Sequence, residues 1–131
     1  MLKASVVVPV FNKEKFISES IASLINQTLS QDDYEIVCVN DGSTDRSVSI
    51  LEDIKNKNPN INLSIVTKDN GGVSSARNEG IKQSKGKYIF FMDADDKISS
   101  NTLKDVVSFF ESVVIVDFYQ ILMQRFFRTG L

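Results

Sequence analysis

Short apolar runs alternate with amphipathic segments along most of the chain. The run from Ala4 to Val10 is β-branched and apolar, which is typical of a strand buried on both faces. Three later runs share this character, and the segments between them place apolar residues at the spacing of one helix face. The predicted strands cover residues 4–10, 34–39, 61–66 and 88–92, and the predicted helices cover 13–26, 47–57, 73–83 and 102–110.

This alternation predicts an α/β fold, a mostly parallel sheet with flanking helices of the Rossmann-like kind. Strand–helix–strand units join parallel strands by right-handed crossovers, and ligands of such sheets bind outside the carboxyl ends of the strands. The residues that follow the four predicted strands are polar, in the segments 11–12, 40–43, 68–70 and 93–96. We therefore expect these four clusters to converge on one rim.

The composition of the chain limits the classes of partner and the types of residue that can carry its chemistry. The chain has 131 residues and a net charge of −2 without a basic block, which fits one domain and gives no reason to expect a nucleic-acid partner. Cys38 is the single cysteine, and Met1 stands directly before the first strand with no room for a signal peptide. Both observations predict a cytoplasmic protein. Since the chain has no histidine, carboxylates must serve any acid–base or metal-binding role.

Three carboxylates crowd the end of the fourth strand, in the sequence Asp93-Ala94-Asp95-Asp96. Like charges this close repel one another unless a cation neutralises them. Carboxylate oxygens are hard ligands that suit Mg²⁺ or Mn²⁺, and Asp93, Asp95 and Asp96 are therefore candidate metal ligands. The alternative is a solvated acidic turn before the next helix.

Two further segments carry candidate chemistry. Asp41 stands at the tip of the second strand, where a carboxylate could accept a hydrogen bond from a nucleobase or a ribose. The alternative there is an Asx-turn or helix cap, with Thr44 or Asp45 as the cap. Arg77 lies one to two turns into a helix and could reach a phosphate or hold an aspartate of the rim, or it could be a solvated arginine.

Four segments in this order resemble the family 2 glycosyltransferases of the GT-A fold. They are the stretches 6–12, 39–45, 70–78 and 93–95, and together they cover the chain from about residue 4 to 105. The resemblance implies a site for a nucleotide-diphosphate sugar, with UDP as the expected nucleotide and Phe11 packing on the base. The implied donor-binding residues are Pro9, Val10, Phe11, Asn12, Asp41, Gly72, Arg77, Asp93, Ala94 and Asp95.

The resemblance also implies a reaction. A bound Mn²⁺ or Mg²⁺ would neutralise the leaving diphosphate while a hydroxyl of a glycan or lipid-linked acceptor attacks with inversion at the sugar. A general base would take the proton of that hydroxyl. In the family this base lies well downstream, and no residue here matches it. A non-catalytic nucleotide-binding or assembly module therefore stays an alternative, and a phosphoacceptor signalling domain fits less well.

The end of the chain departs from the family pattern. We expect a donor-binding domain over residues 1–112 and a truncated or atypical apolar segment over 113–131. Within that segment a strand is predicted over 113–116, followed by a short helix between Phe118 and Phe127. Its apolar side chains could cap the core, or they could be buried by self-association, a partner, a domain swap or the inner surface of a membrane.

Overall fold

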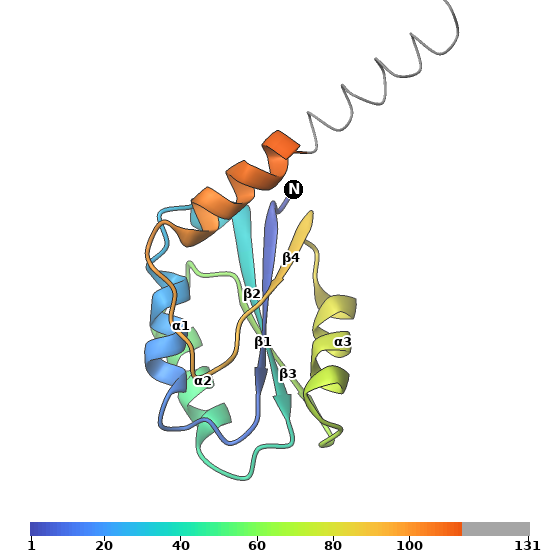
Figure 1. Ribbon diagram of the computed structural model, residues 1–131. Helices are drawn as coiled ribbons and strands as arrows, with labels where there is room; N and C mark the ends of the chain where they lie inside the picture. The colour runs from blue at the N-terminus through green and yellow to red at the C-terminus, as the bar shows by residue number, and fades with distance from the viewer. Residues whose placement is uncertain (114–131) are drawn as a thin grey trace, which may run out of the picture.

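The fold is built on a parallel sheet, as the alternation of strands and helices predicts. The structure, a computed structural model, describes residues 1–113. Within them the sheet has the strand order β3-β2-β1-β4, all parallel (Figure 1). The strands are β1 (Ala4–Val10), β2 (Tyr34–Asp41), β3 (Leu63–Lys68) and β4 (Tyr88–Phe91).

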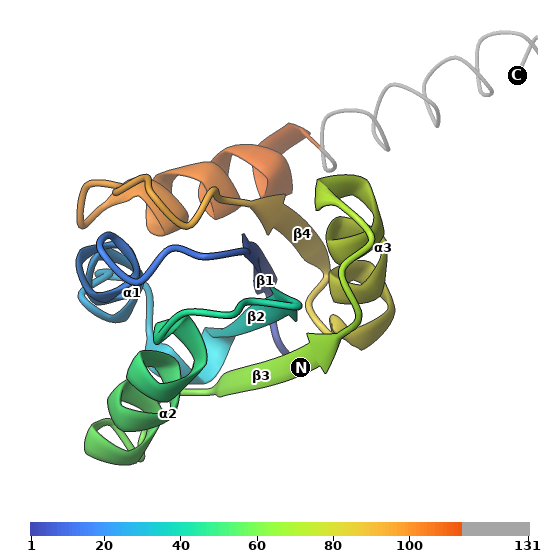
Figure 2. The ribbon, with the colours of Figure 1, turned by 90° about the horizontal axis from the view of Figure 1, so that it is seen from below.

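Helices cover both faces of this sheet. Helices α1 (Ile17–Ile25) and α2 (Ser47–Lys57) lie on one face, and α3 (Val73–Gln83) lies on the other (Figures 1 and 2). A further helix over residues 102–113 packs Leu103 and Val107 into the core on the side of α1. A single 3₁₀ turn, Gln31–Asp33, precedes β2.

The central strand β1 supplies both hydrophobic layers. Val6, Val8 and Val10 are buried with α1 and the 102–113 helix, whereas Val7 is buried with Val37 and with Ala76 of α3. Successive side chains of a strand point to opposite faces, so a run apolar at every position is what a strand covered on both sides requires. This packing holds the carboxyl end of β1 at the centre of the rim.

Most predicted boundaries are confirmed, and turns and pairing across the sheet shift several of the others. Helix α1 begins at Ile17 because the chain first turns, with the Lys13 carbonyl accepting hydrogen bonds from both Phe16 and Ile17. Strand β2 runs on to Asp41, β3 begins at Leu63, and β4 ends at Phe91. The first two differences reflect pairing across the sheet, since Asp41 is in register with Lys68.

The predicted strand over 113–116 is wrong at Val113, which lies in the 102–113 helix. The remainder of that strand and the predicted helix between Phe118 and Phe127 lie outside the described residues, and the proposed domain boundary stays a prediction. No helix among residues 1–113 combines the length and the apolar character needed to cross a membrane.

Candidate functional site

A pocket of about 470 Å³ opens at the carboxyl ends of the strands. Every residue of the predicted donor-binding set lines it except Asn12 and Arg77. Four lining residues were not in that set: Lys13, Asn70, Val73 and Ala76. The four polar clusters therefore meet at one rim, as the parallel sheet predicts.

Asp41 is the most enclosed carboxylate of this pocket, with a side chain that is 4% exposed. Its Oδ1 accepts hydrogen bonds from Lys68 Nζ and from the Gly71 amide, both at 2.9 Å, and its Oδ2 accepts one from the Gly72 amide at 2.9 Å. Burial alone would raise the pKa of Asp41, but these hydrogen bonds outweigh it and the pKa is lowered. Asp41 is therefore ionised and fixes the loop that leads into α3.

Gly72 makes this geometry possible because its φ of 92° lies in a region that glycine enters without strain. The residue stands at the amino end of α3 and turns its amide toward the Asp41 carboxylate. Of the two neighbouring glycines at 71–72, Gly72 is the one that adopts a positive φ. In the segment 39–45, the Asx-turn given as the alternative is formed by Asp45, whose Oδ1 accepts a hydrogen bond from the Ser47 amide at 2.9 Å.

Asn12 ties two loops together from outside the pocket. Its side-chain oxygen accepts hydrogen bonds from the amides of Thr44 at 2.8 Å and Asp45 at 3.3 Å, and its own amide donates to Ser43 Oγ at 3.0 Å. Asp45 completes the junction by accepting from the Glu14 amide at 3.1 Å. Burial opposes ionisation of Asp45, but hydrogen bonds from Ser47 and Glu14 prevail and lower its pKa. Asn12 therefore supports the pocket wall rather than lining it.

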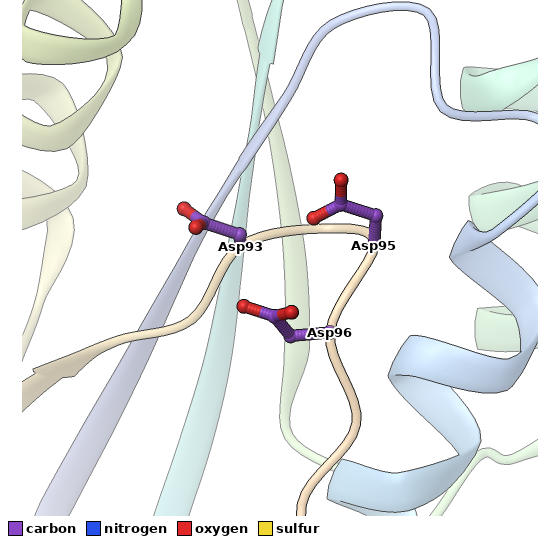
Figure 3. Close-up of side chains that lie close together, drawn as sticks. All are labelled: Asp93, Asp95 and Asp96. Atoms are coloured by element: carbon purple, nitrogen blue, oxygen red, sulfur yellow. The ribbon is translucent and has the colours of Figure 1, made fainter.

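Asp93, Asp95 and Asp96 form an exposed carboxylate cluster on the loop after β4 (Figure 3). One oxygen from each lies within 4.8 Å of the others, and the loop is tightened by a 3.0 Å hydrogen bond from the Asp96 amide to the Asp93 carbonyl. Three hard oxygen donors this close fit a divalent ion such as Mg²⁺ or Mn²⁺, which can complete its shell with water or phosphate. The assignment of these three residues as metal ligands stays a prediction.

Basic side chains approach this cluster from two sides. Arg77 of α3 lies 3.5 Å from Asp93, and its guanidinium is 5.9 Å from the centre of the Phe91 ring. Lys13 lies 3.5 Å from Asp95. The prediction that Arg77 could hold an aspartate of the rim is thus confirmed by position. Lys13 was not among the predicted site residues because it was assigned to the helix over 13–26, whereas it lies in the loop before α1.

The sequence profile of one family, described as Glycosyl transferase family 2, matches residues 5–130 of this chain. A poly(ribitol-phosphate) beta-glucosyltransferase of Bacillus spizizenii is 48% identical over 102 residues, which make up 78% of this chain and 16% of that protein. The chain thus spans less than a fifth of the length of this curated relative.

Comparison with solved structures also finds glycosyltransferases. Staphylococcus aureus TarS in complex with UDP has a TM-score of 0.78 at 36% identity, over 85% of this chain and 32% of that one. The mannosyltransferase PcManGT of Pyrobaculum calidifontis, in complex with GDP-Man and Mn²⁺, has a TM-score of 0.71 at 26% identity, over 72% of this chain and 28% of that one. The shared parallel sheet confirms the predicted GT-A fold. Since the profile match extends over nearly all of its residues, this chain belongs to glycosyl transferase family 2.

Proposed function

We propose that the pocket binds a nucleotide-diphosphate sugar, with UDP as the nucleotide, beside a Mn²⁺ or Mg²⁺ ion held by the acidic cluster. The observation that carries this proposal is that one cavity is lined both by Asp41, with its fixed loop, and by Asp93 and Asp95. A base subsite and a charged diphosphate subsite are the two parts that such a ligand needs. TarS, whose fold this chain shares, was crystallised with UDP.

In this proposal the base lies against Phe11, whose side chain is 46% exposed at the pocket and offers an apolar face. Pro9 and Val10 form the adjoining wall. Asp41 acts mainly by fixing Gly71 and Gly72. Its Oδ2 accepts a 2.9 Å hydrogen bond from the Gly72 amide and a long one, at 3.5 Å, from Asn70 Nδ2, which a base or ribose donor could replace.

The diphosphate and the sugar lie toward the acidic cluster. A bound divalent ion supplies neutralisation of the leaving diphosphate, and Asp93, Asp95 and Asp96 are the residues that would hold it. Arg77 keeps Asp93 in place through their ion pair and its contact with Phe91. The reaction proposed for the family member as a whole is transfer of the sugar to an acceptor hydroxyl with inversion.

Sugar transfer also needs a general base on the acceptor side of the site. Among the described residues, the carboxylates that line the pocket are Asp41, Asp93 and Asp95, and each already has a cationic partner. We assign none of them as the general base. The acceptor, whether a glycan or a lipid-linked molecule, and any contact of Phe118–Phe127 with a membrane or a second copy stay proposals, as does a cytoplasmic location.

A non-catalytic nucleotide-binding module is the second candidate. It is favoured by the pairing of the pocket carboxylates among the described residues, since Asp41, Asp93 and Asp95 each already contact a basic side chain. Both candidates predict donor binding, and only the first predicts sugar transfer by the purified chain.

Titration calorimetry tests the donor site. We expect UDP to bind the wild-type chain in the presence of Mn²⁺, more tightly than GDP, and to bind weakly after the metal is removed with EDTA. Absence of binding by every nucleoside diphosphate would contradict the proposal. Release of UDP and transfer of sugar from a UDP-sugar in the presence of acceptor would then exclude the non-catalytic module.

A further inference from the structure

Lys13 is presented to the pocket from a fixed point of the backbone. Its amide donates a 2.9 Å hydrogen bond to Oγ of the fully buried Ser47, and its carbonyl accepts from Phe16 and Ile17 at the start of α1. Its side chain lines the same cavity as Phe11 and Asp95. Because the backbone is held on both sides, only the side chain is free to change partner.

Three basic side chains pair with carboxylates of this rim, and the pairs differ in strength. Lys68 and Asp41 are 2.9 Å apart, with side chains 21% and 4% exposed. Lys13 and Asp95 are 3.5 Å apart, with side chains 36% and 44% exposed. An exposed pair at that distance contributes about 0–1 kcal/mol, so the Lys13 ammonium can leave Asp95 at little cost. Lys68 has no such freedom.

Charge gives Lys13 a second partner when the pocket is occupied. Among the described residues it is the one basic side chain that lines the cavity, and it reaches the side of the acidic cluster away from Arg77. A divalent ion bound by Asp95 would repel the Lys13 ammonium from that carboxylate, while a diphosphate beside the ion would attract it.

We propose that Lys13 is a phosphate-binding residue of the donor site, for which Asp95 is the resting partner in the absence of ligand. This inference rests on the proposed function and deepens it. Lys13 neutralises Asp95 in the empty pocket, and it donates to a phosphate oxygen when a nucleoside diphosphate and a divalent ion are bound. It therefore contributes to affinity for the diphosphate and not for the nucleoside.

The test compares Lys13→Met with the wild-type chain by titration calorimetry in the presence of Mn²⁺, using UDP and uridine. We expect Lys13→Met to bind UDP about tenfold more weakly, since a charge-assisted hydrogen bond is lost, and to bind uridine as the wild type does. Lys13→Arg should retain most of the affinity. Without nucleotide, Lys13→Met should bind Mn²⁺ up to about fivefold more tightly by electron paramagnetic resonance, because no ammonium competes for Asp95.

Lys57→Met is the matched control. It also removes a lysine from an ion pair, with Asp53 at 2.8 Å, but near the carboxyl end of α2. It should leave both affinities unchanged. Equal UDP affinity in Lys13→Met and the wild type, or a parallel loss of UDP and uridine affinity, would overturn the inference. Failure of the wild-type chain to bind any nucleoside diphosphate would instead contradict the proposed function itself.

Discussion

Lys68 Nζ donates a 2.9 Å hydrogen bond to Oδ1 of Asp41 and so joins the carboxyl ends of β3 and β2. The two residues are directly paired in the register of the parallel strands, so the strand pairing itself places the ammonium beside the carboxylate. The same carboxylate then holds the amides of Gly71 and Gly72. The pair therefore links the edge of the sheet to the entrance of α3.

Removing the Lys68 ammonium should destabilise the chain. We expect Lys68→Met to lower the free energy of unfolding by about 2 kcal/mol, because a buried carboxylate loses its charged partner. Urea denaturation measures this. The control is Lys57→Met, whose pair with Asp53 has nearly the same length but is exposed, and which should cost less than about 0.5 kcal/mol. Equal effects of the two variants would contradict the importance of burial here.

Stability should fall below about pH 3.8 because of Asp41 and Asp45. Both have a pKa below the ordinary 3.8, since hydrogen bonds to their ionised forms outweigh the opposing effect of burial. Their contribution is therefore fully present above pH 3.8 and is lost as the pH falls through the lowered values. Asp41→Asn and Asp45→Asn should each flatten the fall of unfolding free energy as the pH is lowered below 3.8. An equally steep fall in these variants and in the wild-type chain would contradict the contribution of the two carboxylates.

Binding of Mn²⁺ by the acidic cluster should be measurable without an assay of enzyme activity. We expect Asp93→Asn, Asp95→Asn and Asp96→Asn to weaken Mn²⁺ binding by about tenfold or more each, because each removes one charged oxygen donor. Paramagnetic resonance of free Mn²⁺ gives the affinities. At 100 times its dissociation constant, Mn²⁺ should stabilise the wild-type chain by about 2.7 kcal/mol, an effect that EDTA removes. Unchanged Mn²⁺ affinity in all three variants would exclude a metal site here.

Gly80 of α3 packs directly on Val7 of β1, where an added Cβ would overlap the valine side chain. Alanine is the better helix former by about 1 kcal/mol, so propensity alone predicts that Gly80→Ala stabilises the chain. We expect the opposite, a net loss of about 2 kcal/mol from overpacking, measured by thermal or urea unfolding. In the double variant with Val7→Ala, the cost should be smaller than the sum of the single costs. A more stable Gly80→Ala would show that the helix can shift.

Cys38 should be unreactive in the folded chain. The thiol is fully buried, and burial raises its pKa to about 12, so almost no thiolate is present at neutral pH. A disulfide reagent should label it only after denaturation with guanidinium. Rapid labelling of the native chain would mean that β2 is accessible in solution.

The sequence by itself determined the succession of strands and helices along the chain and the rim where polar residues gather. A run such as 6–10, apolar at every position, can be satisfied only by burial on both faces, and the alternation with helices then requires parallel strands. Parallel strands carry their carboxyl ends to one edge, so Asp41 and the acidic cluster had to lie on the same side of the molecule. The family resemblance added the donor-site assignment.

Only the tertiary structure decided how these side chains are paired. The register of β2 with β3 depends on two segments that are distant in sequence. This register places Lys68 opposite Asp41, so that the two side chains can pair. Whether Lys13 begins a helix or faces the pocket depends on Asp45 and on Ser47 at the start of α2. Their side chains accept hydrogen bonds from the amides of Glu14 and Lys13, and α1 begins only at Ile17. Local periodicity carries no information on such contacts, because they form between segments that folding brings together.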